Sequence, residues 1–192
     1  FPMGSTSEIL LISTLVVAMT YLAVEKAYGI AYAAPIVSLL LVVVISYVSL
    51  FDSKMRPAIA PMGDRHWLFV QTSLWFISLI PFFIAFLHAV DILGRKAQRA
   101  QSDASIFDMI MFGFPFLVVA VIMRAVWMNE QPDGKYFLGD LEDIIHILPA
   151  VFFFLYLHFK FVHRWSGAIL ALFAVAGFLT MCLTTARDCG FW

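Results

Sequence analysis

Long apolar runs alternate with short polar clusters along the whole chain. A helix that crosses a bilayer needs about 20 predominantly apolar residues. Six runs approach or exceed this length, over residues 8–28, 29–51, 67–91, 107–128, 141–163 and 166–186. The connectors 52–66, 94–105 and 129–140 carry the proline, glycine and charge of water-exposed turns. The pattern predicts an all-α, polytopic integral membrane protein whose six or so transmembrane helices form one bundle, as a single domain over residues 1–192.

The composition agrees with this class and removes others. Hydrophobic residues make up 62% of the chain and charged residues only 13%, whereas soluble domains carry about 25% charged residues. A net charge of -1 and the absence of any Lys/Arg-rich block exclude a nucleic-acid partner. The first apolar run has no basic segment and no small-residue cleavage site before it, so we expect a retained helix. The expected partner is the lipid bilayer.

An even number of spans puts both chain ends on one side of the membrane, here called side A, with side B opposite. The turns on side B carry six basic residues: Lys26, Arg95, Lys96, Arg99, Lys160 and Arg164. Those on side A carry five: Lys54, Arg56, Arg65, Lys135 and Arg187. Because cytoplasmic loops are richer in Lys and Arg, this small difference predicts chain ends on the non-cytoplasmic side.

Two sets of ionisable residues interrupt the apolar runs. Such groups are costly at membrane depth and point to function or to a specific pairing. The side A set is Arg124, Glu142, Asp143 and His146, and the side B set is His88, Asp91, Asp108 and His158. On side A we expect an ion pair between Arg124 and Asp143 or Glu142. This pair either belongs to an ion pathway or only holds two helices together.

These two sets favour transport as the leading function. We expect a transporter or channel for a proton, a cation or a small solute, or else an embedded subunit of a larger membrane complex. All eight residues of the two sets are candidates for the proton or ion pathway.

The alternative function is a redox or metal-binding membrane protein. An aspartate beside a histidine raises the basicity of the imidazole, which suits a metal ligand. Two stacked haems between these helices would each need one histidine from each helix at the same level. His66 and His88 are about 33 Å apart along one helix, whereas His146 and His158 are only about 18 Å apart along the other, so this arrangement is excluded. A single haem b or a metal ion between His88 and His158 is left.

A second alternative is a membrane-embedded zinc hydrolase. Ser78, His88, His158 and His163 are similar to the polar residues of membrane hydrolases of the alkaline ceramidase type, which place zinc on transmembrane histidines. The paired histidines of that family are four residues apart, whereas His158 and His163 are five apart. No H-E-x-x-H, G-x-S-x-G or nucleotide-binding motif is present, so on balance we do not expect an enzyme.

Small residues form a stripe on the last span, at Gly167, Ala171, Ala174 and Gly177. Steps of three and four put them on one helical face, where another helix can approach closely. That helix belongs either to the same bundle, to another subunit or to a second copy of the chain.

Prolines lie inside the second to fifth predicted spans, at Pro35, Pro81, Pro115 and Pro149. Each lacks the amide proton that would continue the helical ladder, so a carbonyl one turn earlier needs another partner.

Overall fold

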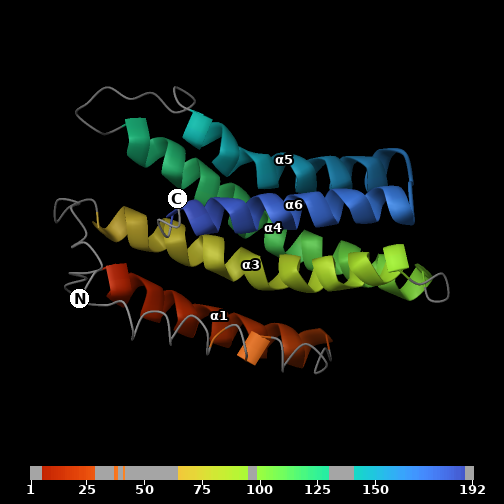
Figure 1. The fold of residues 1–192 in the computed structure, drawn as a ribbon, viewed down its shortest axis with the longest axis horizontal. Helices are drawn as coiled ribbons and strands as arrows, with labels where there is room; N and C mark the ends of the chain where they lie inside the picture. Colours follow the sequence, from red (N-terminus) through yellow and green to blue (C-terminus); the bar gives the residue numbers. More distant parts are fainter. Residues whose placement is uncertain are drawn as a thin grey trace.

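The computed structural model describes residues 6–28, 37–38, 41, 65–94, 99–129 and 141–188. In this part of the chain the main elements are five helices (Figure 1): α1 (Thr6–Tyr28), α3 (Arg65–Gly94), α4 (Arg99–Asn129), α5 (Leu141–Val162) and α6 (Ala168–Asp188). The predicted all-α fold is confirmed. The predicted second span, with Pro35, lies almost entirely outside the described residues.

Four of these helices are long and apolar enough to cross a membrane: residues Val70–Gly94, Ser102–Val126, Ile144–Val162 and Ala168–Arg187. Their ends agree with the predicted spans to within a few residues, except at the start of α4. That helix begins at Arg99, inside the stretch predicted to be the connector 94–105. The prediction was wrong there because it followed hydropathy alone, whereas Arg, Ala and Gln are polar or small residues that favour helix.

The four spanning helices pack as a ring. Helix α3 packs against α4 and α6, and α5 packs against the same two helices, so that α3 and α5 lie on one diagonal. Helix α1 lies along the outside of α3 (Figure 1). Because successive helices of the ring run in opposite directions, α3 and α5 both run from side A to side B.

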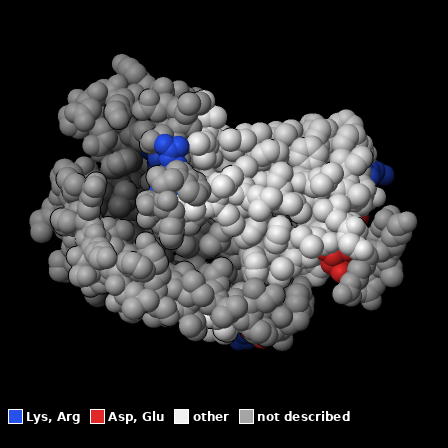
Figure 2. All heavy atoms as spheres, in the orientation of Figure 1, with Lys and Arg blue, Asp and Glu red and all other residues white. Residues whose placement is uncertain are grey.

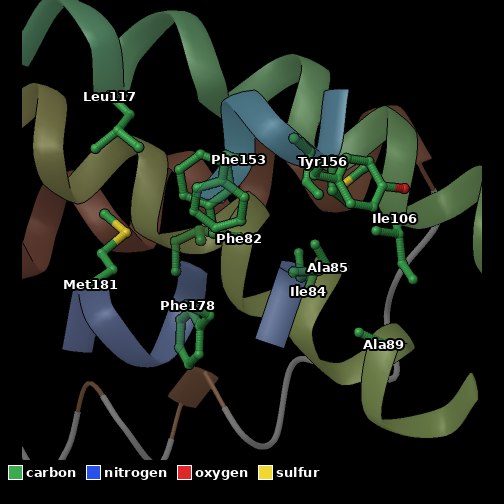
Figure 3. Close-up of a cluster of buried hydrophobic side chains, with 14 of the residues drawn as sticks. Phe82, Ile84, Ala85, Ala89, Ile106, Leu117, Phe153, Tyr156, Phe178 and Met181 are labelled. Atoms are coloured by element: carbon green, nitrogen blue, oxygen red, sulfur yellow. The ribbon is translucent and has the colours of Figure 1, made fainter. Parts of the chain in front are cut away.

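Two phenylalanines meet at the centre of this ring. Phe82 from α3 and Phe153 from α5 are both 0% exposed, and their rings stack with centroids 3.8 Å apart (Figure 3). A glycine flanks each ring from the neighbouring helices. A Cβ added at Gly113 of α4 would lie 3.0 Å from Cε1 of Phe82, and one at Gly177 of α6 would lie 2.9 Å from Cζ of Phe153. The stack therefore brings all four helices together.

The stripe of small residues on α6 is used inside the chain. Ala171, Ala174 and Gly177 are buried, and Gly177 faces the Phe153 ring. Gly167 lies in the turn before α6 with a φ of +84°. The interpretation as bundle packing is confirmed, and these three buried residues offer no face to a second copy or to another subunit.

The outer surface suits lipid. Large apolar side chains such as Leu15, Ile122, Phe154 and Leu172 are exposed on four different helices. On the face drawn in Figure 2, uncharged residues cover the middle of the described helices and the charged atoms lie at its margins. This is the distribution expected of a bilayer-spanning bundle.

A threonine on α6 compensates for a proline on α5. Pro149 has no amide proton to donate to the carbonyl oxygen of Ile145, one turn earlier. The Thr184 hydroxyl lies 3.3 Å from that oxygen and 2.8 Å from the carbonyl oxygen of Thr180 in its own helix, so its one proton serves two acceptors. The freed carbonyl thus becomes a link between α5 and α6.

The tight contact at Gly177 predicts a large effect of added volume. Gly177→Leu should lower the free energy of unfolding by about 1–3 kcal/mol, because the Phe153 ring is held by Phe82 and has no room to move. Thermal unfolding of the detergent-solubilised chain measures the change. Gly94→Leu is the matched control, since a Cβ at Gly94 meets nothing within 4 Å. Equal loss in both variants would contradict the packing described.

The link from Thr184 to Ile145 is open to a double-mutant cycle. Thr184→Val should cost about 0.5–1.5 kcal/mol of unfolding free energy. In a Pro149→Ala background the cost should be smaller, because the new amide at position 149 supplies the missing helical bond. Thr180→Val is the control, because its hydroxyl bonds only to carbonyl oxygens of Ala176 and Gly177 in its own helix. A cost independent of the residue at position 149 would rule out the compensation.

Candidate functional site

Histidines and aromatic rings gather at the side B end of α5, in what we call the histidine–aromatic cluster: His158, Phe159, His163 and Trp165. Phe159 and Trp165 stack with ring centroids 4.5 Å apart and planes 8° apart. The His163 ring lies 5.5 Å from Phe159 and 5.8 Å from Trp165. His158 lies at the edge of the cluster, 5.6 Å from His163.

The turn after α5 positions this cluster. The amides of His163 and Trp165 both donate to the carbonyl oxygen of Phe159, each at 3.2 Å. Arg164 between them has a φ of +51°, a left-handed conformation that costs a non-glycine residue about 1–2 kcal/mol. This reversal of the chain carries Trp165 back over Phe159, and so assembles four rings from eight consecutive residues.

An aspartate of α4 anchors the same turn. The Gly167 amide donates to Oδ2 of Asp103 at 3.1 Å. Phe107, one turn further along α4, meets Phe161 edge-on at 5.4 Å between centroids. Sequence reasoning missed Asp103 because it placed this residue in a connector. The steps of four from Ser102 to Ile106 and Ile110, all three buried, are the signal that could have extended the helix.

His158 faces outward from the bundle. Its side chain is exposed, and its ring stacks on Phe154 with centroids 6.1 Å apart. Phe154 and Phe161 on the same surface are 56% and 60% exposed. An imidazole on an apolar surface, among aromatic rings and near the end of a span, is available to a ligand that approaches from the bilayer boundary.

The predicted ligand pair His88 and His158 is level in the membrane but on different faces. Counted from the stacked pair Phe82 and Phe153, His88 is six residues and His158 five residues further toward side B. Since a helix turns about 100° per residue, His88 is rotated about 240° and His158 about 140° away from the direction in which the two phenylalanines meet. Neither imidazole therefore points along the α3–α5 diagonal.

The remaining side B residues are spread over the surface. Asp91 is half-buried near the end of α3, and Asp108 is exposed on α4.

The residues considered for a zinc hydrolase do not meet. Ser78 is fully buried, and its hydroxyl donates to the carbonyl oxygen of Trp75 in its own helix at 2.7 Å. Among the described residues no group of three or more His, Cys, Asp or Glu side chains could hold a metal ion. The polar residues considered for zinc are thus not gathered into one site.

A second polar group lies inside the side A end of the bundle. His146 of α5 is 3% exposed, and its ring lies 6.1 Å from that of Trp75 on α3. The Trp75 indole N–H donates to Oγ1 of Thr185 on α6 at 3.0 Å. Arg124 of α4 is half-buried near this end, and its Nε atom is buried with no hydrogen-bond partner in the described part of the chain.

The expected ion pair of Arg124 with Glu142 or Asp143 cannot be located, because the side chains of both acids lie outside the described residues. The pair therefore stays a prediction. His146 lies buried beside Trp75 at the side A end, and its grouping with Arg124, Glu142 and Asp143 also stays a prediction. Sequence reasoning missed Trp75, whose partner Thr185 is 110 residues away and is found only through the fold.

The fold and its surface define the class first: a polytopic helical membrane protein with polar groups at the two ends of its bundle. The family model described as Cytochrome C assembly protein matches residues 3–186. The chain therefore belongs to the cytochrome c assembly protein family.

Three relatives illustrate the match, and each carries the printed name cytochrome c biogenesis protein CcsA. The protein of Chlamydomonas reinhardtii is 27% identical over 68% of this chain and 40% of its own length. That of Guillardia theta is 22% identical over 94% of this chain and 71% of its own. That of Cyanophora paradoxa is 35% identical over 38% of this chain and 22% of its own. The chain thus matches less than half of two of these relatives.

No solved structure matches this chain.

The family match corrects the leading functional expectation. A transporter or channel for a proton, cation or small solute was wrong, because the match over residues 3–186 is to proteins of cytochrome c assembly. Ionisable residues at span ends were read as an ion pathway, although the same residue types also suit ligand binding. The haem alternative agrees better with the family.

Proposed function

We propose that this chain takes part in cytochrome c assembly by binding haem at the side B end of its bundle, with the His158 imidazole as a ligand of the haem iron. Imidazole is a common axial ligand of haem iron in proteins. Assembly of a c-type cytochrome requires haem to reach a polypeptide that holds it at a C-x-x-C-H segment. Haem is then a cargo of this protein, and it has to be bound and later released.

One observation carries the proposal: His158 is exposed on an apolar, aromatic surface at the end of a membrane span. Haem is a flat and largely apolar molecule with carboxylates on one edge. Phe154, stacked on His158, and the outward Phe161 supply apolar surface at this position. The boundary of the bilayer accommodates both the apolar ring and the carboxylates of haem, because the apolar and the polar regions of the bilayer meet there.

We assign the iron ligand to His158 and not to His163, although the side chains of both are exposed. His158 lies within the span Ile144–Val162, whereas His163 follows its end and its ring packs on Phe159 and Trp165. His158 stands at the edge that faces the bilayer. A haem held by one imidazole from this chain keeps its other axial position for water or a further ligand, and a single bond is easier to break when cargo is passed on.

His88 has no part in the proposed site, since its helical phase turns it away from His158. The small excess of basic residues on side B puts the cluster at the cytoplasmic face in the orientation that we propose. In this orientation haem would be bound on the side of the membrane opposite to the chain ends.

The test is a haem titration of the full chain in lipid nanodiscs, followed by visible absorption. His158→Ala should weaken haem binding at least tenfold and should abolish the change in the haem absorption spectrum that ligation by one imidazole produces. Added free imidazole should restore this change, because it replaces the deleted ligand without changing the protein. This rescue separates ligation from a general loss of structure.

The matched control is His163→Ala, which removes an imidazole of the same cluster. We expect it to keep the spectrum of imidazole-ligated haem, since His163 lies beyond the end of the span. Unchanged binding in His158→Ala, or loss of this spectrum only in His163→Ala, would contradict the assignment of His158.

A further inference from the structure

Arg124 lies on the face of α4 that points into the bundle. The buried positions of this helix repeat at steps of three and four: Ser102, Ile106, Met109, Ile110, Gly113, Leu117 and Ala120. Arg124 is the next position in that repeat. It follows Ala120 by four residues, so its side chain starts on the inward face and not on the lipid face.

The Arg124 side chain reaches the level of Trp75 and His146. Gly113 is level with Phe82, so Arg124 lies eleven residues, about 16 Å, from the central stack toward side A. Trp75 lies seven residues, about 10 Å, from it in the same direction. Helical side chains lean toward the N-terminus of their helix, which for α4 is the side B end. This tendency brings the guanidinium closer to the level of Trp75.

Two buried donor atoms near this level lack an acceptor in the described part of the chain. Nε of Arg124 and Oγ of Ser73 are buried and have no hydrogen-bond partner in the described part of the chain. The acidic side chains that the structure describes are Glu25, Asp91, Asp103 and Asp108, and all four lie toward side B. A half-buried guanidinium is costly when no anion pairs with it, and a buried polar atom without a partner calls for a specific explanation.

We propose that Arg124 binds the carboxylate of an apolar ligand at the side A end of the bundle. The planar guanidinium fits a carboxylate through two parallel hydrogen bonds. An apolar body attached to that carboxylate suits the exposed apolar surface of the bundle. Two sources share this chemistry, namely the porphyrin cargo, if the proposed function holds, and a fatty acid of the bilayer.

This site is distinct from the haem-iron site. His146, on the same level, is twelve residues before His158 on α5, a separation of about 18 Å along the helix. The His158 side chain is exposed, whereas His146 is buried. A carboxylate bound by Arg124 is therefore held at the opposite end of the bundle.

The experiment uses three probes that contain no iron, so that it does not depend on His158. The full chain in nanodiscs is titrated with protoporphyrin IX, with its dimethyl ester, which lacks free carboxylates, and with oleate. We expect Arg124→Gln to weaken binding of protoporphyrin IX at least tenfold and to leave binding of the ester unchanged. Arg124→Lys keeps the charge but loses the paired geometry, and its loss should be smaller.

The arms of the titration separate the two sources. Arg124-dependent binding of protoporphyrin IX identifies the porphyrin cargo, and Arg124-dependent binding of oleate alone identifies a membrane fatty acid. Equal affinity of wild type and Arg124→Gln for all three probes would overturn the proposal. A failed haem titration at His158 with a positive result here would reject the proposed function and keep the carboxylate site.

A further arm examines an internal ion pair. Glu142→Gln and Asp143→Asn are each combined with Arg124→Gln in a double-mutant cycle of thermal unfolding. If Arg124 binds an external carboxylate, the effects on stability should add. Strong coupling with either acid, together with unchanged probe binding, would show that the guanidinium is already paired within the chain.

Discussion

The stacking of Phe82 on Phe153 is the interaction on which the arrangement of the helices depends. The two rings lie on the diagonal of the four-helix ring, and Gly113 and Gly177 let the other two helices close on them. In a bilayer, lipid competes for apolar side chains as well as protein does, so helices associate through close packing and not through hydrophobicity alone. A centre made of two large rings and two residues without side chains supplies such packing.

This apolar centre confines the polar chemistry to the two ends of the bundle. Near side B, the reversal at Arg164 assembles the histidine–aromatic cluster, and Asp103 holds the turn in place. Near side A, the indole of Trp75 and the hydroxyls of Thr184 and Thr185 join three helices. The same helices join the two ends, but the polar groups at the two ends differ. One presents imidazole at the lipid boundary, and the other holds the half-buried Arg124 with its buried Nε atom.

The sequence was sufficient to predict the fold class, because apolar runs of membrane length are a strong signal. The ends of four helices followed from the same runs, and the start of α4 did not, since Arg99 to Ser102 favours helix without being apolar. The small-residue stripe on α6 predicted close packing correctly, and its partner Phe153 became known only with the structure. The pattern of residues along the sequence could not show that the Thr184 hydroxyl donates to the Ile145 carbonyl oxygen that Pro149 leaves without a helical partner.

The candidate sites were less predictable than the fold. The sequence left His88 and His158 as a possible ligand pair, but helical phase turns them to different faces, and phase is known only from the packing of Phe82 and Phe153. The family match over residues 3–186 then changed the meaning of the same polar residues from an ion pathway to cytochrome c assembly. His158, first chosen as half of a ligand pair, is proposed here as a single ligand at the membrane surface.

The most direct measurement is an absorption spectrum of the full chain, purified in detergent after expression with haem available, first oxidised and then reduced with dithionite. Haem bound through one imidazole, with its other axial position open, gives a broad visible band in the reduced state, and we expect this band. A reduced spectrum without any visible band, from folded protein supplied with haem, would contradict a role for this chain in binding haem.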